Sequence, residues 1–278
     1  MTGNTGNTGN TGNTGNTGNV GNAGGGGGGW FFPDRIDLPF AFDAGGTSQL
    51  TTRPYFPDRL WDPQWLSWLI LQEFTTKNWT AINLTAAASQ IPGTAAGIKA
   101  ELDNLLEAAV DERADALGEI LAQSEEFLSV FVGLLGINTA SYAKTRLLLH
   151  VGELVGTFAV MYFKASARRP RPSQLCPALM PPILVPGHAS YPSGHATQAY
   201  LVAECVKLAL PAANNVSVAL SNNLDILARR IARNREIAGL HYPSDSAAGK
   251  ELAGKLLALL QTCAKFNTAV TDAAAEWT

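Results

Sequence analysis

The chain has 278 residues, of which 46% are hydrophobic and 15% charged, so it is long and apolar enough to bury a sizeable core. Its formal net charge of -3 argues against nucleic acid as a partner, because nucleic-acid-binding domains are usually basic. No basic segment followed by an apolar one stands at the N-terminus, and no uninterrupted apolar run reaches the ~20 residues of a membrane span. These features predict a soluble protein without a signal peptide or membrane span, and they favour a cytoplasmic location.

Residues 1–29 form a glycine-rich tail that contains six Thr-Gly-Asn triplets between residues 2 and 19. Because the tail has almost nothing apolar to bury, the first expectation is disorder. A glycine at every third position also lets extended three-fold helices pack side by side, so tails from several subunits could associate. This second interpretation predicts a homo-oligomer that dissociates when residues 1–29 are removed, which light scattering measures.

Residues 30–80 are rich in aromatic residues and proline, and we expect loops with a short helix from Gln64 to Phe74. Residues 81–278 are predicted to be a helical domain, because apolar spacings of three and four residues dominate there. The spacing predicts helices over Ala95–Ala122, Glu125–Leu135, Ser141–Ala167, Pro192–Leu210, Val216–Ala238 and Ser244–Lys265. A proline-rich loop covers Pro170–Tyr191, and Pro192 is expected in the first turn of the next helix. No alternating strand pattern is convincing, so the predicted class is all-α.

Two basic clusters stand out in this acidic chain. Four basic residues lie from Lys164 to Arg171 and four from Arg229 to Arg235, with no acidic residue in either stretch. One such cluster is more often a solvated helix face. Two clusters beside histidine-containing segments favour an anion-binding site.

The first two segments carry groups suited to holding an oxyanion. Lys164 stands near the end of a long apolar helix, and Arg171 lies in the loop after it; an ammonium and a guanidinium both donate to oxyanions. Ser193 and Gly194 stand at a predicted helix N-terminus, where free backbone N–H groups point toward an anion. Gly194 also lets the backbone approach the anion closely.

The histidines supply reactive groups. His195 can move a proton near neutral pH. In the third segment Arg235 adds a guanidinium, and His241 is followed four residues later by Asp245. A carboxylate that accepts the imidazole N–H would fix the tautomer and raise the nucleophilicity of the other ring nitrogen.

In order, the three segments read Lys-x6-Arg-Pro, Pro-Ser-Gly-His and Arg-x5-His-x3-Asp, from Lys164 to Asp245. This pattern resembles the signature of the superfamily that unites type 2 phosphatidic acid phosphatases, bacterial class A acid phosphatases and vanadium-dependent haloperoxidases. Asn234 departs from it, because the family usually has serine before the arginine. The resemblance implies a helical bundle of the acid phosphatase and haloperoxidase type.

The resemblance also implies a role for each matched residue. His241 would be the nucleophile that forms a phosphohistidine in a phosphatase, or the ligand of vanadate in a haloperoxidase. His195 would be the general acid or base, and Asp245 would orient His241. The oxyanion would be held by Lys164, Arg171, Ser193, the Gly194 N–H and Arg235.

Two reaction classes therefore remain open. Short spacings of 21 residues between Arg171 and Ser193, and 39 between His195 and Arg235, favour a small phosphatase without a cofactor that acts on a small phosphoester. Met161 agrees, because haloperoxidases often have tryptophan there.

Two other residues favour a haloperoxidase that uses vanadate, hydrogen peroxide and a halide. His188 lies seven residues before His195, where algal bromoperoxidases place a second histidine near the halide. Ala196 follows His195, at a position where the phosphatases often have a hydroxyl residue. A non-catalytic assembly protein that uses the tail is a third alternative. We expect a phosphoester hydrolase, with the haloperoxidase second.

Overall fold

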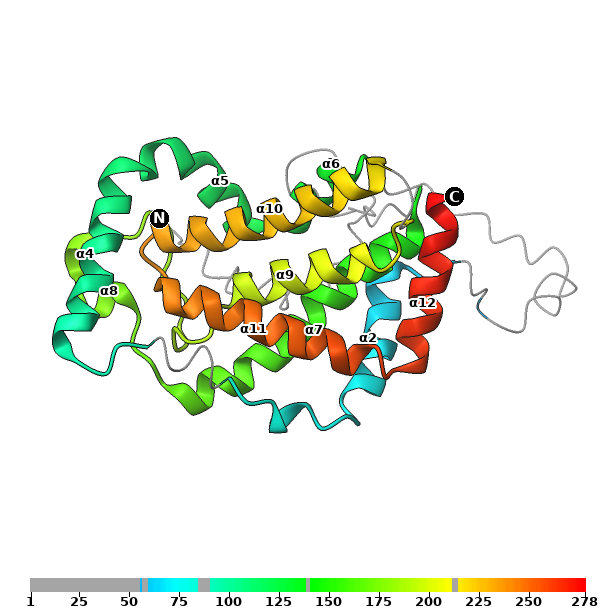
Figure 1. The fold of residues 1–278 in the computed structure, drawn as a ribbon, viewed down its shortest axis with the longest axis horizontal. Coiled ribbons are helices and arrows are strands. Elements are labelled where there is room, and N and C mark those ends of the chain that lie inside the picture. The colour runs from blue at the N-terminus through cyan, green and yellow to red at the C-terminus, as the bar shows by residue number, and fades with distance from the viewer. Residues whose placement is uncertain (1–55, 57–59, 85–90, 139–140, 212–214) are drawn as a thin grey trace, which may run out of the picture. The chain divides into compact units, whose positions relative to one another are not determined.

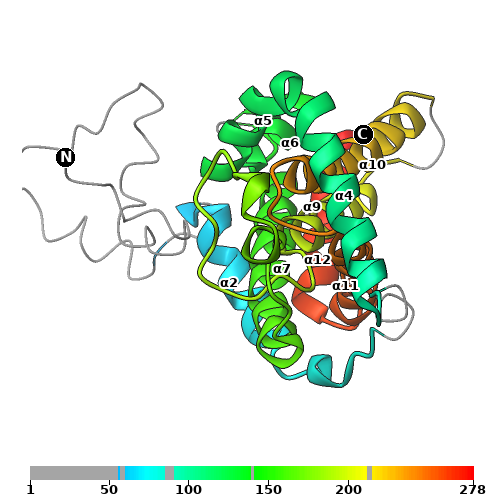
Figure 2. The same ribbon diagram turned by 90° about the vertical axis from the view of Figure 1, so that its left-hand side faces the viewer.

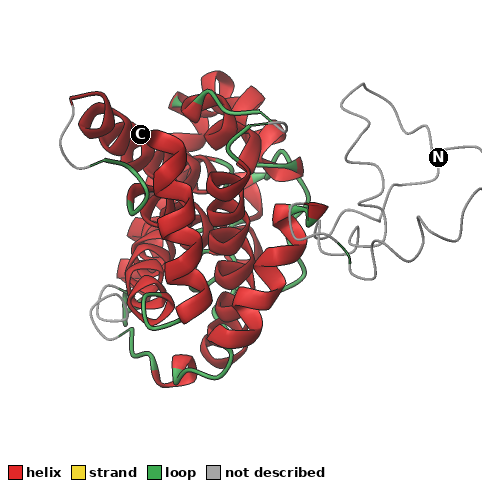
Figure 3. Cartoon of the chain, turned by 90° about the vertical axis from the view of Figure 1, so that its right-hand side faces the viewer, coloured by secondary structure: helices red, strands yellow, loops and turns green. Residues whose placement is uncertain are grey.

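A computed structural model describes residues 56, 60–84, 91–138, 141–211 and 215–278 of the chain. Every regular element within these ranges is a helix, and Figure 3 shows only helices and loops there. The predicted all-α class is confirmed. One compact unit extends from Asp62 to the C-terminus and thus includes residues 62–80. The tail of residues 1–29 lies outside the described residues, so its order and the oligomer that it predicts remain predictions.

The longer helices, in chain order, are α2 (Pro63–Phe74), α4 (Ala95–Asp111), α5 (Arg113–Glu125), α6 (Leu128–Leu135), α7 (Ala143–Ala167), α9 (Gly194–Lys207), α10 (Asn215–Ile237), α11 (Pro243–Leu260) and α12 (Ala264–Ala274). Short helical turns are η4 (Trp79–Ala81), α8 (Pro172–Leu175), η5 (Pro177–Leu179) and η6 (Ala275–Trp277). In Figure 1, α9 lies between α10 and α11, with α7 beside it.

Helix α9 forms the centre of the core, where it packs against α7, α10 and α11. Its buried residues include Leu201, Val202 and Val206, which are fully shielded from solvent. A Cβ atom on Gly152 of α7 would stand 2.7 Å from the Val202 Cα, so this glycine lets the backbones of α7 and α9 approach closely. Helices α2 and α12 pack on α7 as well.

Helix α7 begins the one described stretch that is long and apolar enough to cross a membrane by length and composition, Ala143–Leu175. In its most apolar window 56% is buried inside the protein, and the buried residues include Leu148, Val151 and Val155. The core helix of a folded domain has the same properties.

The N-terminus of α9 differs from the expectation for Pro192. The helix begins at Gly194, and Ser193 is its N-cap, with Oγ accepting the Ala196 N–H at 3.4 Å. Ser193 has an extended backbone, and its own N–H donates to the Asp245 carbonyl at 2.9 Å. Pro192 is therefore outside the first turn, because this tertiary hydrogen bond fixes the residue after it as the cap.

Three other predicted boundaries were wrong. The stretch Ala95–Ala122 contains two helices, because Glu112 ends α4 and precedes α5, with Arg113 donating to the Leu179 and Ile237 carbonyls of other segments. Glu125 belongs to α5, not to α6. The last predicted helix ends early at Leu260, and α12 follows an extended Cys263.

Several helix ends gather at one end of the bundle. The C-termini of α7 and α10 and the N-termini of α9 and α11 point the same way in Figure 1, where α4, α5 and α8 also lie. Figure 2 looks onto this end, with α4 and α5 in front. Helix ends expose unpaired backbone groups, so this arrangement favours a polar site.

Candidate active site

Four of the predicted residues lie at the ends of the clustered helices. Lys164 is in the last turn of α7, and Arg171 is the N-cap of α8. Ser193 caps α9, and Arg235 is in the last turn of α10. All four are at most 1% exposed, so the structure buries each polar side chain together with the helix end that carries it.

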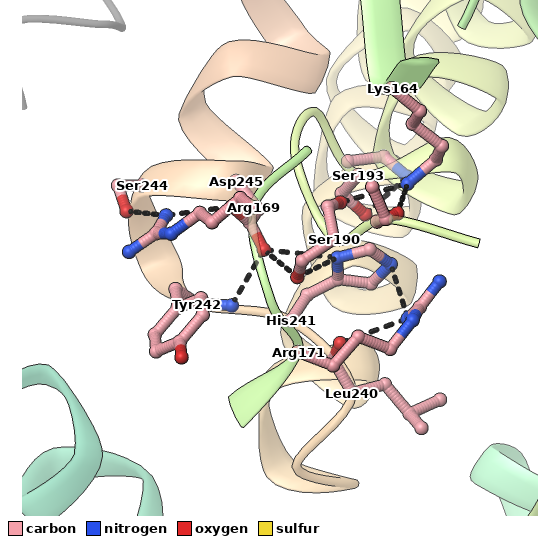
Figure 4. Close-up of polar contacts among 12 residues, drawn as sticks. Lys164, Arg169, Arg171, Ser190, Ser193, Leu240, His241, Tyr242, Ser244 and Asp245 are labelled. Atoms are coloured by element: carbon pink, nitrogen blue, oxygen red, sulfur yellow. Dashed lines mark hydrogen bonds and ion pairs between the residues drawn. The ribbon is translucent and has the colours of Figure 1, made fainter. Parts of the chain in front are cut away.

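His241 and Asp245 form a buried hydrogen-bonded pair at the start of α11 (Figure 4). His241 Nδ1 lies 3.2 Å from Asp245 Oδ2. The same oxygen accepts the Ser190 hydroxyl and, at 3.1 Å, the Tyr242 N–H. Because a carboxylate only accepts, it selects the tautomer with hydrogen on Nδ1 and leaves a lone pair on Nε2.

Burial dominates the titration of this pair. It lowers the pKa of His241 well below its usual value, although the hydrogen bond to Asp245 acts in the opposite direction. Burial by itself would raise the pKa of Asp245, but the contacts with His241 and the charge of Arg169 hold that pKa below its usual value. The pair is therefore a neutral imidazole on an ionised carboxylate at neutral pH.

Lys164 lies above the pair in Figure 4 and is held by backbone carbonyls. Its Nζ donates to the carbonyls of Ala189 and Ser190, at 2.8 Å each. Burial, followed by the charge of Arg171, lowers the pKa of Lys164 to about 7. An anion beside the ammonium would favour its charged form.

Arg171 connects the pair to the proline-rich loop. Its NH1 lies 3.4 Å from His241 Nε2 and donates to the Leu240 carbonyl at 3.0 Å. Its Nε donates to the His188 carbonyl at 3.0 Å, and its NH2 lies 3.1 Å from His188 Nδ1. The exposed His188 is thus a direct neighbour of Arg171; partial burial and the charge of Lys164 lower its pKa to about 4.

Arg235 is the least satisfied cation in the site. Its NH2 donates to the Ile120 carbonyl at 3.0 Å, while Nε and NH1 are buried and have no hydrogen-bond partner. Burial lowers its pKa to about 10, so the guanidinium stays charged at neutral pH. Buried donors without an acceptor are rare in folded proteins, and here they fit an anionic ligand.

His195, in the first turn of α9, is surrounded by the same cations. Its Nε2 lies 3.2 Å from the Gln123 carbonyl near the end of α5. Burial and then the charges of Arg235, Lys164 and Arg171 lower its pKa to about 3. His195 is consequently neutral in the protein without a bound anion.

The three buried cations Lys164, Arg171 and Arg235 form no ion pair with any carboxylate in the described ranges. By contrast, Arg169 pairs with both Asp245 and Glu101. Asp245 offsets part of their charge at longer range, so the site carries an excess of positive charge, which suits an oxyanion. In the part of the chain that the structure describes, no group of three His, Cys, Asp or Glu side chains could hold a metal ion.

Sequence reasoning missed three residues that contact the predicted ones, Ser190, Arg169 and Gln123, and also Glu101, which contacts Arg169. The position of Arg169, two residues before Arg171, was a signal for one of them. Ser190 has no distinctive pattern, and Gln123 acts on His195 through its backbone carbonyl, which any residue would supply.

Asn234, the residue before Arg235, is 3% exposed and joins α10 to α5. Its Nδ2 donates to Glu119 Oε2 and Gln123 Oε1, at 3.0 Å each. It therefore has a structural role beside Arg235.

Compared with known proteins, the chain matches no protein-family model and no curated protein.

Proposed function

We propose that the chain is a phosphoester hydrolase that acts through a phosphohistidine on His241, in a helical bundle of the acid phosphatase and haloperoxidase type. One observation carries the proposal most: Arg235 is buried with Nε and NH1 unpartnered, and its charge acts on His195 together with those of the buried Lys164 and Arg171. Phosphate oxygens are the acceptors that these donors lack. The order of the three sequence motifs supports the same conclusion.

The hydrogen-bond pattern supports the following reaction scheme. Once Arg171 NH1 donates to the phosphate instead of to His241 Nε2, the lone pair on Nε2 attacks phosphorus. The bond from phosphorus to the leaving oxygen breaks, and that oxygen takes a proton from His195. Water then attacks the phosphohistidine while His195 removes its proton, and the phosphorus–nitrogen bond breaks to release phosphate. Lys164, Arg171 and Arg235 stabilise the charge on the pentacoordinate phosphorus.

His195 can take part because the substrate changes its surroundings. Burial lowers its pKa most, and the charges of Arg235, Lys164 and Arg171 lower it further. A phosphate dianion offsets those charges, so its binding raises the pKa of His195. The substrate thereby helps to supply the proton that its own leaving group needs.

The decisive experiment measures hydrolysis of a chromogenic phosphomonoester by metal-stripped, phosphate-free protein. We expect His241→Ala to abolish turnover and retain the helical circular dichroism spectrum. Arg168→Met is the matched control, because it removes a basic residue that is exposed and lies at the end of α7. Hydrolysis by His241→Ala at the wild-type rate would refute the proposed nucleophile.

A vanadium-dependent haloperoxidase is the second candidate, favoured by the 3.1 Å contact between Arg171 NH2 and His188 Nδ1. The three cations Lys164, Arg171 and Arg235 form a cradle for an oxyanion. The same cradle and His241 Nε2 would hold vanadate, which would activate hydrogen peroxide for halide oxidation. A vanadate-loaded sample is assayed with peroxide and bromide or iodide on a halogen-accepting dye. Fast oxidation with negligible hydrolysis would favour this candidate. Neither activity, with intact phosphate binding, would favour the non-catalytic assembly role.

A further inference from the structure

Arg169 is held between two carboxylates behind the His241–Asp245 pair. Its NH1 donates to Asp245 Oδ1 at 2.7 Å, and its NH2 donates to Glu101 Oε2 at 2.6 Å. Its guanidinium also stacks on the Tyr242 ring, 3.8 Å from the ring centre. Figure 4 shows Arg169 on the side of Asp245 that faces away from His241.

The two oxygens of Asp245 have different partners. Oδ2 accepts from His241 Nδ1, Ser190 and the Tyr242 N–H, whereas the donor to Oδ1 is Arg169. A carboxylate with one unbound oxygen can turn about its terminal torsion, which is broad and two-fold. The contact with Arg169 removes that freedom and keeps Oδ2 on His241.

Glu101, which comes from α4, fixes Arg169 in turn. Its Oε2 accepts from Arg169, and its Oε1 accepts the Ser244 hydroxyl at 2.6 Å. The side chains of Arg169 and Glu101 are only 10% and 13% exposed, so solvent screens this ion pair weakly. Ser244 also accepts from Arg169 NH1 at 2.7 Å, so the three side chains form a closed triangle.

We propose that Arg169, held by Glu101, is a positioning residue that aligns Asp245 on His241 for the reaction. This inference rests on the proposed function, because it assigns the pair Glu101–Arg169 to the same chemistry. It also gives α4 a part in the reaction, although α4 lies about 140 residues before the histidine in sequence. The neighbouring Arg168 does not share the role, because it is exposed at the left-handed C-cap of α7.

The test compares Arg169→Met, Arg169→Lys and Arg168→Met in the full chain at one fixed pH. Nitrogen-15 spectra of the histidine side chains report the His241 tautomer, titration with inorganic phosphate reports the cradle, and phosphomonoester assays give kcat and KM. We expect Arg169→Met to lose the single Nδ1–H signature of His241 and to lower kcat by roughly 10- to 100-fold, as is typical when a partner of a reactive histidine is removed. Phosphate affinity and KM stay unchanged, because Lys164, Arg171 and Arg235 are intact.

Arg169→Lys keeps the charge but cannot reproduce a planar, forked contact. We therefore expect it to restore the Nδ1–H signature and kcat only in part. Arg168→Met should match the wild type throughout. A wild-type tautomer signature and kcat in Arg169→Met, with only a lower melting temperature, would overturn the proposal. If Arg169→Met does not fold, Glu101→Gln replaces it. A wild-type tautomer signature and a wild-type kcat in both Glu101→Gln and Arg169→Lys would then overturn the proposal.

The two proposals fail in different ways. An inactive wild-type protein would refute the proposed hydrolase. The nitrogen-15 signature needs no turnover, so it still decides whether Arg169 aligns Asp245 on His241.

Discussion

Lys164, Arg171 and Arg235 are cations that the fold buries almost completely, at 1% exposure each. Removing a cation from water costs several kcal/mol unless a counter-charge and hydrogen bonds compensate it. Backbone carbonyls satisfy part of each side chain, but no described carboxylate pairs with any of the three. These residues therefore destabilise the protein until an anion binds, a common compromise at functional sites.

Lys164→Met tests this compromise through the pH dependence of stability. Burial lowers the pKa of Lys164 from 10.5 to about 7, so the unfolded chain binds more protons between these values. Wild-type stability should consequently rise across this window, relative to Lys164→Met, by several kcal/mol. Denaturant unfolding of both proteins in phosphate-free buffer, at about pH 6 and about pH 10, measures the difference. The lost hydrogen bonds to Ala189 and Ser190 add an offset that does not depend on pH. A stability difference that is equal at both pH values would contradict the burial of a charged lysine.

His195→Ala tests the proton-transfer step separately from binding. The imidazole contacts the Gln123 carbonyl and lies in the electrostatic field of three cations. Its removal leaves the unpartnered Nε and NH1 of Arg235 in place. We expect kcat to fall by roughly 100-fold or more, and the affinity for inorganic phosphate to stay close to the wild type. Steady-state kinetics and phosphate titration give the two quantities. Unchanged kcat would exclude His195 as the acid.

Among the elements, the contact between α9 and α11 sets the geometry of the site. A Cβ atom on Gly249 of α11 would stand 2.8 Å from the Ser193 carbonyl and 2.8 Å from the Ala196 Cβ. The Ser193 N–H also donates to the Asp245 carbonyl. Close approach of these two helices therefore sets the distance from the start of α9 to the His241–Asp245 pair.

Gly249→Ala and Gly254→Ala form a matched pair within α11. Alanine at position 249 forces the two helices apart, so we expect a loss of about 1 to 3 kcal/mol in the free energy of unfolding and weaker phosphate binding. Nothing lies within 4 Å of a Cβ at Gly254, so alanine there should stabilise the helix by up to about 1 kcal/mol without affecting phosphate. Urea unfolding and phosphate titration measure both effects. Equal phosphate affinity in the two variants would show that this contact does not position the cradle.

Strong periodicity made some elements predictable. Helices α2, α7 and α10 match the expected ranges to within two residues, because each has a long apolar stripe that faces the core. The six residues Lys164, Arg171, Ser193, Arg235, His241 and Asp245 meet because each lies at or near a helix end. The boundary at residues 261–263 has no glycine or proline, so local sequence did not reveal the break before α12.

The partners of the site were less predictable, because they come from distant segments. Glu101 contacts a residue 68 positions away, and Gln123 contacts one 72 positions away. Such contacts depend on how α4 and α5 pack, and neither residue stands in a distinctive local pattern. Ser190 is closer in sequence, but a serine in a proline-rich loop resembles any other polar loop residue.

For the molecule as a whole, α4 and α5 are joined to the rest partly through the polar site. The two helices bury few apolar residues, among them Leu105, Ala108 and Ile120. Their polar contacts include Glu101 with Arg169, and the carbonyls of Ile120 and Gln123 with Arg235 and His195. A ligand that fixes the cations should therefore stabilise this part of the fold as well.

Inorganic phosphate should accordingly raise the melting temperature of the protein, and vanadate should compete with it for one site. At 100 times its dissociation constant a ligand adds about 2.7 kcal/mol, which corresponds to roughly 5 to 10 °C for a domain of this size. Thermal unfolding with each anion alone and with both together measures the effect. One shared site predicts that vanadate adds little to a phosphate-saturated sample, because its binding first displaces phosphate. Arg235→Met should lose most of the response to both anions, since it removes the unpartnered Nε and NH1, while Arg168→Met keeps it. Additive shifts from the two anions would require separate sites and contradict the single cradle.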